Sequence, residues 1–319
     1  MYYFIVNPIS GGGRGKKVWA ALQRTLEHQS VEYRAWLLRR RGEAREIAAS
    51  LSKLKHDYTA VIVGGDGTID EFIDGLGSLD HITLGCIPTG SGNDFVRGLA
   101  LPTDPAAALD MILHPQAIRR LKVGTILADS QDSSPLPQAE PRTRCRHSFI
   151  VSSGIGFDAD VCNGVCRSAL KQFLNLFHLG KLIYLTTALR MLISMKQYRM
   201  KATLSDGSEL SFEKVFFTAV MNLSYEGGGF RFAPDADPED DCFQVCIAHS
   251  LTRRRILCLL PLALDGRHAG KEGVRIFPCR SLTLEFPAPL CLHTDGEVIG
   301  FFDRVTFGAR PQRLPVITG

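Results

Sequence analysis

The sequence has no long apolar run, and this absence narrows the classes of protein to which it can belong. A transmembrane helix needs about 20 consecutive apolar residues. The nearest candidate, residues 170–195, is interrupted by Lys171, Lys181 and Arg190. Residues 1–6 are apolar, but they lack the charged start and the long apolar stretch of a secretory signal peptide. We therefore expect neither a membrane-spanning segment nor a signal peptide.

Cysteines are present, but not in the pattern of a zinc site or a disulfide scaffold. There are nine, an odd number, and no two are spaced as Cys-x-x-Cys. This usage favours reduced thiols and a cytoplasmic protein. Strong charge is also lacking, because the formal net charge is only +4. Such a charge allows an anionic ligand or membrane surface and gives no reason to expect nucleic acid.

The stretch from Ala60 to Glu71 carries the clearest chemical signal. Residues 60–63 are apolar and mostly β-branched, which predicts a buried parallel strand. Glycines and Asp66 follow, and the apolar spacing from Thr68 to Leu76 predicts a helix. Glycines let the backbone approach a phosphate, and a helix start offers free N–H groups. Asp66 would repel a phosphate unless a cation lay between them, so we predict a phosphate site with a divalent cation. A tight turn with Asp66 as a helix cap is the alternative.

Two further glycine-rich loops follow predicted strands. Residues 2–6 predict a strand, and residues 7–15, NPISGGGRG, come directly after it. Residues 82–87 predict another strand, which leads into residues 88–95, PTGSGNDF. Because ligands bind at the carboxyl ends of parallel strands, the three loops can converge on one ligand. One such loop is a weak signal, whereas three in alternating strand and helix order are a strong one.

The chain is expected to form two domains, as its length of 319 residues favours. Residues 1–122 predict an α/β nucleotide-binding domain, with a parallel sheet and flanking helices. Residues 123–304 predict a mainly antiparallel β-sandwich domain with helical insertions. The C-terminal strand, within 305–319, can return to the first domain.

Within the second part, helices are expected over 158–195 and 252–264. Residues 129–147 are rich in Ser, Pro, Gln and charge, which predicts a mobile hairpin tip. Residues 117–127 predict one extended segment that joins the domains. The expected strands are Ser148–Ile155, Met200–Leu204, Val215–Leu223, Phe243–Ala248, Gly273–Phe277, Leu282–Phe286 and Val305–Phe307.

Five motifs along the chain belong together. They are Asn7-Pro8-x-Ser10-Gly11, Gly64-Gly65-Asp66-Gly67-Thr68, Pro88-x-Gly90-Ser91-x-Asn93-Asp94-Phe95, Gly227-Gly228-Gly229 followed by Ala233-Pro234-x-Ala236, and Asp295-Gly296-Glu297. In this order they resemble the diacylglycerol kinase catalytic-domain family, specifically the soluble bacterial lipid kinases related to sphingosine and ceramide kinases. The GGDGT core also occurs in NAD kinases and phosphofructokinases, but the third and fifth motifs favour lipid kinases.

The resemblance implies ATP and Mg²⁺ as cofactors and a lipid hydroxyl as acceptor, with the active site between the two domains. Glu297 would be the general base, and Asp66 and Asp94 would organise the catalytic magnesium and its water. A structural magnesium is implied at Asp241 with the carbonyls of Pro238 and Phe243. The residues implied to bind ATP are Asn7, Ser10, Gly11, Gly64, Gly65, Asp66, Gly67, Thr68, Ile69, Asp70, Glu71 and Ser91.

The chemistry agrees with these implied roles. Phosphoryl transfer needs positioning and neutralisation of phosphate charge, and a carboxylate base helps an alcohol to attack. Asp295-Gly296 is a hairpin signal that would hold Glu297 on a rigid turn; without the resemblance, Glu297 is better interpreted as an exposed hairpin residue. Residues 235–241, DADPEDD, suit Mg²⁺, with a solvated acidic loop as the alternative.

Three positions depart from the family pattern. Asp70 stands where the family usually has Asn, and Cys242 replaces a common Gly. Lys122 is aligned with an Asp of the magnesium network that many relatives carry. A lysine there would repel the cation or pair with phosphate, so it puts catalytic efficiency in doubt.

We predict an ATP-dependent lipid kinase that transfers the γ-phosphate to a lipid hydroxyl, with diacylglycerol as the leading substrate and phosphatidic acid as product. Phosphatidylglycerol or another lipid alcohol stays open. The alternatives are an NAD-kinase-like kinase of a soluble metabolite, and a nucleotide- or lipid-binding module with impaired catalysis.

The predicted partner is a lipid at the inner face of the membrane, which the cytoplasmic enzyme would touch peripherally. Residues 173–195 are expected to pack as a core helix, with a membrane-contacting surface as the alternative. No nucleic-acid partner is expected, and a homodimer is left open.

Overall fold

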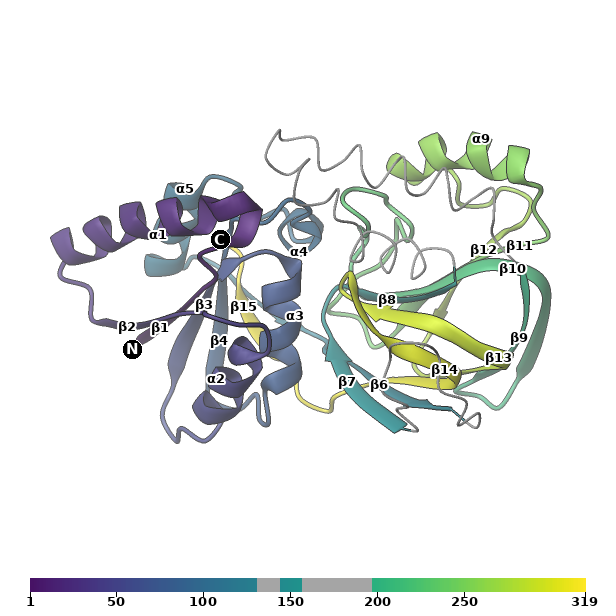
Figure 1. Cartoon of the computed structure of the whole chain (residues 1–319), viewed down its shortest axis with the longest axis horizontal. Helices are drawn as coiled ribbons and strands as arrows, with labels where there is room; N and C mark the ends of the chain where they lie inside the picture. Colours follow the sequence, from purple (N-terminus) through teal and green to yellow (C-terminus); the bar gives the residue numbers. More distant parts are fainter. Residues whose placement is uncertain (131–143, 157–196) are drawn as a thin grey trace. The chain divides into compact units, whose positions relative to one another are not determined.

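The computed structural model describes residues 1–130, 144–156 and 197–319 (Figure 1). It divides into two units. The first contains Met1–Val123 and Pro311–Gly319, and the second contains Gly124–Arg310. The helix expected over 158–195, with its alternative as a membrane-contacting surface, lies outside the described residues.

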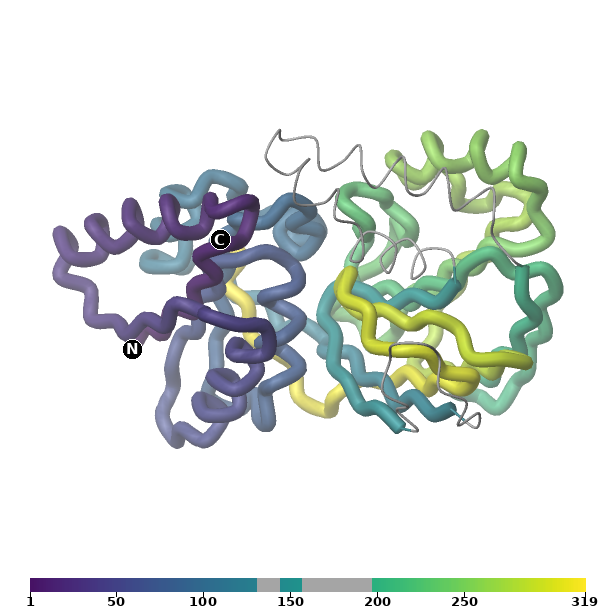
Figure 2. The backbone as a smooth tube through the Cα atoms, viewed as in Figure 1, coloured from purple at the N-terminus to yellow at the C-terminus, as the bar shows by residue number. Residues whose placement is uncertain are grey.

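The first unit is built on a six-stranded sheet with the order β2-β1-β3-β4-β15-β5. All neighbours are parallel except β5, which runs antiparallel to β15. The last strand therefore inserts beside β4, as the end of the chain in Figure 2 shows. The strands are β1 (Tyr2–Val6), β2 (Tyr33–Leu37), β3 (Tyr58–Gly64), β4 (Ile82–Pro88), β5 (Ile118–Leu121) and β15 (Leu314–Ile317).

Helices cover both faces of this sheet (Figure 1). Trp19, Leu22 and Leu26 form the apolar stripe of α1, and they pack with α5 on side chains such as Phe4 and Val63. The opposite face is covered by α2 and α3. The helices are α1 (Ser10–His28), α2 (Glu43–Leu51), α3 (Asp66–Gly75), α4 (Asp94–Gly98) and α5 (Pro105–Leu113).

The second unit is a nine-stranded, antiparallel assembly. Its order is β12-β11-β10-β8-β13-β14-β6-β7, and β9 pairs with both β10 and β13. Helix α9 (Arg253–Leu264) covers part of it. The strands are β6 (Gly124–Asp129), β7 (Arg144–Phe149), β8 (Ser152–Gly156), β9 (Tyr198–Leu204), β10 (Glu209–Met221), β11 (Phe243–His249), β12 (Val274–Cys279), β13 (Leu282–Thr294) and β14 (Glu297–Ala309).

The predicted fold class is confirmed, and the helix expected over 252–264 is α9. Two predictions about residues 117–147 were wrong. The extended segment 117–127 is two strands, β5 and β6, which belong to different sheets. Of the hairpin tip expected over 129–147, residues 144–147 belong to β7, which pairs with β6, and residues 131–143 lie outside the described residues.

The structure bears on the expectations about membrane-spanning segments and cysteines only for the described residues. No helix among them is long and apolar enough to cross a bilayer. The cysteines in this part of the chain are free thiols.

Candidate active site

Three loops meet at the carboxyl edge of the first sheet. β1, β3 and β4 are parallel neighbours, so the loops after them leave the same edge. The backbone N–H of Thr89 donates to the carbonyl of Gly64 over 2.8 Å. The side-chain amide of Asn7 donates to the hydroxyl of Thr68 over 2.9 Å. The predicted convergence of the three glycine-rich loops is confirmed.

The first loop turns sharply and lies against the third. Residues 11–13 are glycines with φ of +57°, +68° and +93°, in the left-handed region that favours glycine. The Ser10 hydroxyl is 2.8 Å from the carbonyl of Asn7 and 2.6 Å from the hydroxyl of Thr89. A Cβ on Gly11 would collide with the carbonyl of Thr89. Ser10 and Gly11 are therefore held in the loop by packing as well as by turn geometry.

The second and third loops touch through Gly65 and Gly90. A Cβ added to Gly65 would lie 2.9 Å from the Cα of Gly90, and one added to Gly90 would lie 2.6 Å from the Cα of Gly65. A Cβ on Gly92 would lie 2.9 Å from Oδ2 of Asp66 and 3.8 Å from Oδ2 of Asp94. Backbone thus packs on backbone, with two carboxylates beside it. This surface is of the kind that cradles phosphates.

Asp66 ties these loops together. Its Oδ2 accepts the N–H of Asp94 and its Oδ1 accepts the N–H of Phe95, both over 3.1 Å. Asp66 therefore binds the first N–H groups of α4, in the next loop.

The surroundings of Asp66 raise its pKa above the usual range of an aspartate. Removal of the carboxylate from solvent is the main cause, and the backbone N–H donors of Phe95, Asp94 and Asn93 oppose it. A bound cation would oppose it further, because it favours the charged form. A divalent cation would therefore stabilise a carboxylate that is costly to ionise alone.

Asp94 and Asn93 place more oxygen atoms on the third loop. Asp94 is 7% exposed, and its Oδ1 pairs with Nη1 of Arg97 at 2.8 Å. Asn93 has a φ of +55°, and its Nδ2 donates to the carbonyl of Gly90 over 3.1 Å. Within the described part of the chain, no donor reaches the buried Oδ1 of Asn93. A buried acceptor of this kind fits a metal-bound water or a ligand donor, so the oxygen set fits a hydrated Mg²⁺.

The other residues implied to bind ATP lie in different surroundings. Glu71 is turned to the start of α2, where its Oε2 accepts the N–H of Gly42 over 2.9 Å and its Oε1 lies 3.9 Å from Nε of Arg41. Asp70 is 2% exposed within α3, whereas Ser91 is exposed. The structure therefore brings Asn7, Ser10 and Thr68 into the loop contacts and directs Glu71 to α2.

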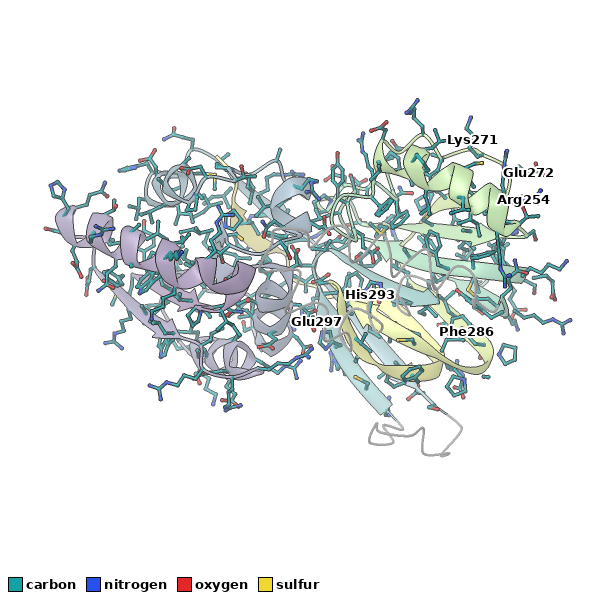
Figure 3. All side chains as sticks on the ribbon, turned by 45° about the horizontal axis from the view of Figure 1, so that its top comes forward. Arg254, Lys271, Glu272, Phe286, His293 and Glu297 are labelled. Atoms are coloured by element: carbon teal, nitrogen blue, oxygen red, sulfur yellow. The ribbon has the colours of Figure 1, made fainter. Side chains whose placement is uncertain are left out.

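In the second unit, Glu297 follows a tight turn. Asp295 and Gly296 have φ of +47° and +84°, as a type I′ turn requires. Thr294 pairs with Glu297 across the turn. The predicted hairpin is confirmed, and Glu297 is the partly exposed first residue of β14, as Figure 3 shows.

Asp295 is a buried structural residue of this hairpin. Its Oδ2 accepts the N–H of Ile150 over 3.0 Å, and its Oδ1 accepts the N–H groups of Val151 and Ser152 over 2.8 and 2.9 Å. These bonds explain why the strand predicted over 148–155 was wrong. The predicted strand is interrupted between β7 and β8. Backbone N–H groups there donate to the Asp295 carboxylate instead of to a neighbouring strand.

A buried contact between a glutamate and a histidine lies close to the same turn. Oε1 of Glu226 is 2.9 Å from Nε2 of His293, and their side chains are 7% and 0% exposed. Glu226 also exchanges two backbone hydrogen bonds with Phe230, which closes the loop of glycines 227–229. The pair therefore fixes this glycine loop to β13, two residues before the turn.

The acidic loop of residues 235–241, which was predicted to hold a structural magnesium, exposes its Asp241 carboxylate to solvent. The Asp241 side chain is 66% exposed and lies 3.7 Å from Nη2 of Arg280. Pro238 and Phe243 are buried on either side of it. No group of three or more His, Cys, Asp or Glu residues in the described ranges could hold a metal. A magnesium here would therefore need backbone carbonyls as ligands.

Comparison with known proteins decides the family. Residues 1–126 match the diacylglycerol kinase catalytic domain, and residues 151–318 match the YegS C-terminal NAD kinase beta sandwich-like domain. The chain belongs to the diacylglycerol kinase family. It is 29% identical over 306 residues to "Putative lipid kinase YtlR" of Bacillus subtilis, covering 94% of each chain. It is 27% identical to the diacylglycerol kinase of the same organism, covering 93% of this chain and 89% of that one.

Solved structures of this family share the fold. The crystal structure of a "putative diacylglycerol kinase" from Bacillus anthracis matches with a TM-score of 0.76 at 20% identity, covering 100% of this chain and 95% of that chain. At this identity the likeness shows the fold alone. Family membership makes the chain a phosphotransferase with an alcohol acceptor, and the kinase family implies use of ATP.

Four residues that make the contacts described above were absent from the predicted site residues. Thr89 and Asn93 lie within the third motif, so their hydroxyl and amide groups were the available signal. Glu226 and His293 gave no signal, because no spacing rule brings such distant residues together. Their pairing depends on the packing of the second unit.

The close contact between Gly65 and Gly90 gives a testable prediction. Gly90→Ala is expected to lower the free energy of unfolding by about 1–3 kcal/mol, because its Cβ cannot fit without a backbone shift. It should also weaken ATP binding. Gly77→Ala is the control, since its Cβ would meet only Ser52 at 3.7 Å. Denaturation and ATP titration of both variants would measure this; equal stability of the two would contradict the packing argument.

Proposed function

We propose that this chain is an ATP- and Mg²⁺-dependent lipid kinase that phosphorylates diacylglycerol to phosphatidic acid. The observation that carries the proposal is the convergence of three glycine-rich loops around Asp66 and Asp94. Such loops suit a nucleoside triphosphate, because backbone N–H groups bind the phosphates while the carboxylates hold a cation. The name of the related Bacillus subtilis diacylglycerol kinase supports the choice of lipid.

The proposal assigns separate tasks to the chain's own residues. Asn7, Ser10 and Gly11 with the loop of residues 64–71 and Ser91 would bind ATP. Asp66 and Asp94 would hold Mg²⁺, which neutralises phosphate charge when bound. Glu297 would accept the proton of the lipid hydroxyl, while that oxygen bonds to the γ-phosphorus and the bond to ADP breaks. Asp241, Pro238 and Phe243 would hold a structural Mg²⁺.

A lipid acceptor also implies a setting for the enzyme. We propose that it works in the cytoplasm, peripheral to the inner face of the membrane, with a homodimer left open. Phosphatidylglycerol and other lipid alcohols remain candidate acceptors, because no residue described above distinguishes one lipid head from another. This proposed location is supported only by the class of substrate, which is a lipid.

The raised pKa of Asp66 predicts how magnesium use depends on pH. Mg²⁺ binds the charged carboxylate, so protons compete for Asp66 at a higher pH than for an ordinary aspartate. The Mg²⁺ concentration needed for half-maximal rate should therefore rise as pH falls towards this raised pKa. Asp66→Asn should weaken Mg·ATP use and flatten this pH dependence. If rate, magnesium dependence and pH profile all stay as in the wild type, the role of Asp66 is wrong.

The proposed function is tested by transfer of labelled γ-phosphate from ATP in mixed micelles with magnesium. The acceptors are diacylglycerol, phosphatidylglycerol, ceramide, NAD and a blank. Label in diacylglycerol supports the proposal. Label in another lipid keeps the reaction and changes the substrate, whereas label in NAD overturns the lipid proposal.

The NAD-kinase-like alternative is favoured by one finding, the match of residues 151–318 to a domain described as NAD kinase beta sandwich-like. A nucleotide- or lipid-binding module is favoured by Lys122, which is 1% exposed and stands where the family resemblance implies an acid. ATP binding without label in any acceptor would support that module.

A further inference from the structure

Helix α9 has an unusual composition for a helix on the surface. Its residues 256–264, ILCLLPLAL, contain no charged or hydrogen-bonding polar side chain. A helix that is apolar all round is normally buried in protein or in a membrane. The inner face of α9 is indeed buried, through Ile256, Leu259 and Ala263. The outer face needs a separate explanation.

The outer face presents apolar side chains to solvent. Leu257 is 43% exposed and Leu264 is 50% exposed, and Cys258 and Pro261 between them are exposed as well. At 100° per residue, these positions share one side of the helix, opposite the buried stripe. Single exposed apolar residues are ordinary, but a continuous row of them marks an interaction surface.

Positive charge lies at one end of this face. Arg253, Arg254 and Arg255 are all exposed in the first turn of α9, and that turn contains no acidic residue. The helix dipole makes the N-terminal turn an unfavourable place for cations, so these arginines do not stabilise the helix. Figure 3 shows Lys271 and Glu272, both exposed, on the same side of this unit as Arg254, so the positive charge at α9 comes from its own arginines.

We propose that the outer face of α9 docks onto an anionic lipid bilayer. An apolar face flanked by cations is the pattern of helices that lie in the membrane interface. The arginines complement anionic headgroups, and the leucines can enter the acyl boundary. The inference rests on the proposed function, since a lipid kinase must reach an acceptor held in a bilayer.

The docking face is separate from the proposed base. Glu297 lies well away from Arg254 in Figure 3, so α9 would anchor the protein and would not form the acceptor site. Loss of docking should therefore impair turnover of diacylglycerol presented in vesicles. Turnover of a water-soluble, short-chain diacylglycerol should stay unchanged.

The test uses the full chain and vesicles of phosphatidylcholine with or without phosphatidylglycerol. Wild type is expected to sediment with the anionic vesicles and to be released by salt. Arg253→Gln with Arg254→Gln should weaken this binding by about 30-fold, at about 5-fold for each charge. Leu257→Gln with Leu264→Gln should weaken it by about 10-fold or more.

The chain offers a matched control for each pair. Leu37 is 47% exposed in β2, so Leu37→Gln removes an equally exposed leucine elsewhere. Lys53→Gln with Lys55→Gln removes the same charge from an exposed loop. Leu37→Gln should leave vesicle binding unchanged. Lys53→Gln with Lys55→Gln should weaken vesicle binding only through the lower total charge of the protein, and so less than the arginine pair does. Circular dichroism would verify that every variant is folded.

Three vesicle-binding results would overturn the proposal: no wild-type binding to anionic vesicles, equal binding of wild type and α9 variants, or equal losses in the controls. A change from dimer to monomer in the leucine variant, with vesicle binding intact, would assign the face to a second copy and overturn it too. Failure of the proposed kinase function looks different. In that case no lipid would be phosphorylated, although vesicle binding through α9 would persist.

Discussion

Glu297→Gln is expected to lower lipid phosphorylation by about 10²–10⁴-fold while ATP binding is unchanged. The amide has the size of the carboxylate but cannot accept the hydroxyl proton at neutral pH. The turn that positions residue 297 is made by Asp295 and Gly296, so the substitution leaves its backbone geometry in place. Turnover in mixed micelles and calorimetric titration with ATP would measure the two quantities.

A second substitution on the same hairpin distinguishes the loss of the catalytic base from a general distortion of the hairpin. Glu285 on β13 lies 3.6 Å from Arg304 in an ion pair whose side chains are 40% and 51% exposed. Exposed pairs of this kind contribute little to stability. Glu285→Gln should therefore leave turnover at the wild-type level. Wild-type turnover in Glu297→Gln would remove Glu297 from the role of base, and equal losses in both variants would indicate a disturbed hairpin.

Asp295→Ala is expected to lower the free energy of unfolding by about 3 kcal/mol or more. The change removes the acceptor of three buried backbone N–H groups, from Ile150, Val151 and Ser152. Each buried donor that loses its partner costs about 1–3 kcal/mol. Asp295 also adopts a φ of +47°, which alanine tolerates less well than aspartate. Urea denaturation followed by circular dichroism would measure the loss.

Two companion variants sharpen this test. Asp295→Asn can keep an oxygen for Val151 and Ser152, but its amide would face the N–H of Ile150, so a smaller loss is expected. Asp206 precedes Gly207 in the β9–β10 connection, and its carboxylate is exposed to solvent and accepts the N–H of the nearby Ser208. Asp206→Ala should change the stability by about 0.5 kcal/mol or less. A loss for Asp206→Ala as large as for Asp295→Ala would contradict the account of Asp295.

The sequence predicted those parts of the fold that follow from local pattern. Buried parallel strands such as β3 have a continuous apolar run, and glycine loops after them mark the carboxyl edge of the sheet. The Asp295-Gly296 turn was predictable for the same reason, because its two residues carry the backbone requirement themselves. The apolar spacing from Thr68 to Leu76 likewise located α3.

The missed features depend on contacts between distant segments. Asp66 was a candidate cap for its own helix, yet its carboxylate binds the N–H groups of Asp94 and Phe95 in the next loop. The break between β7 and β8 follows from Asp295, 145 residues from Ile150 in sequence. The Glu226–His293 pair is of the same kind. No local pattern encodes such partners, because packing of the completed unit creates them.

Mass spectrometry of the lipid after incubation with purified protein, Mg²⁺ and ATP tests the central claim most directly. The account predicts that diacylglycerol gains one phosphate as a monoester, in step with ADP formation, and that Glu297→Gln nearly abolishes both. ADP formed without any phosphorylated lipid, or a product equally abundant with Glu297→Gln, would contradict the proposed lipid kinase mechanism.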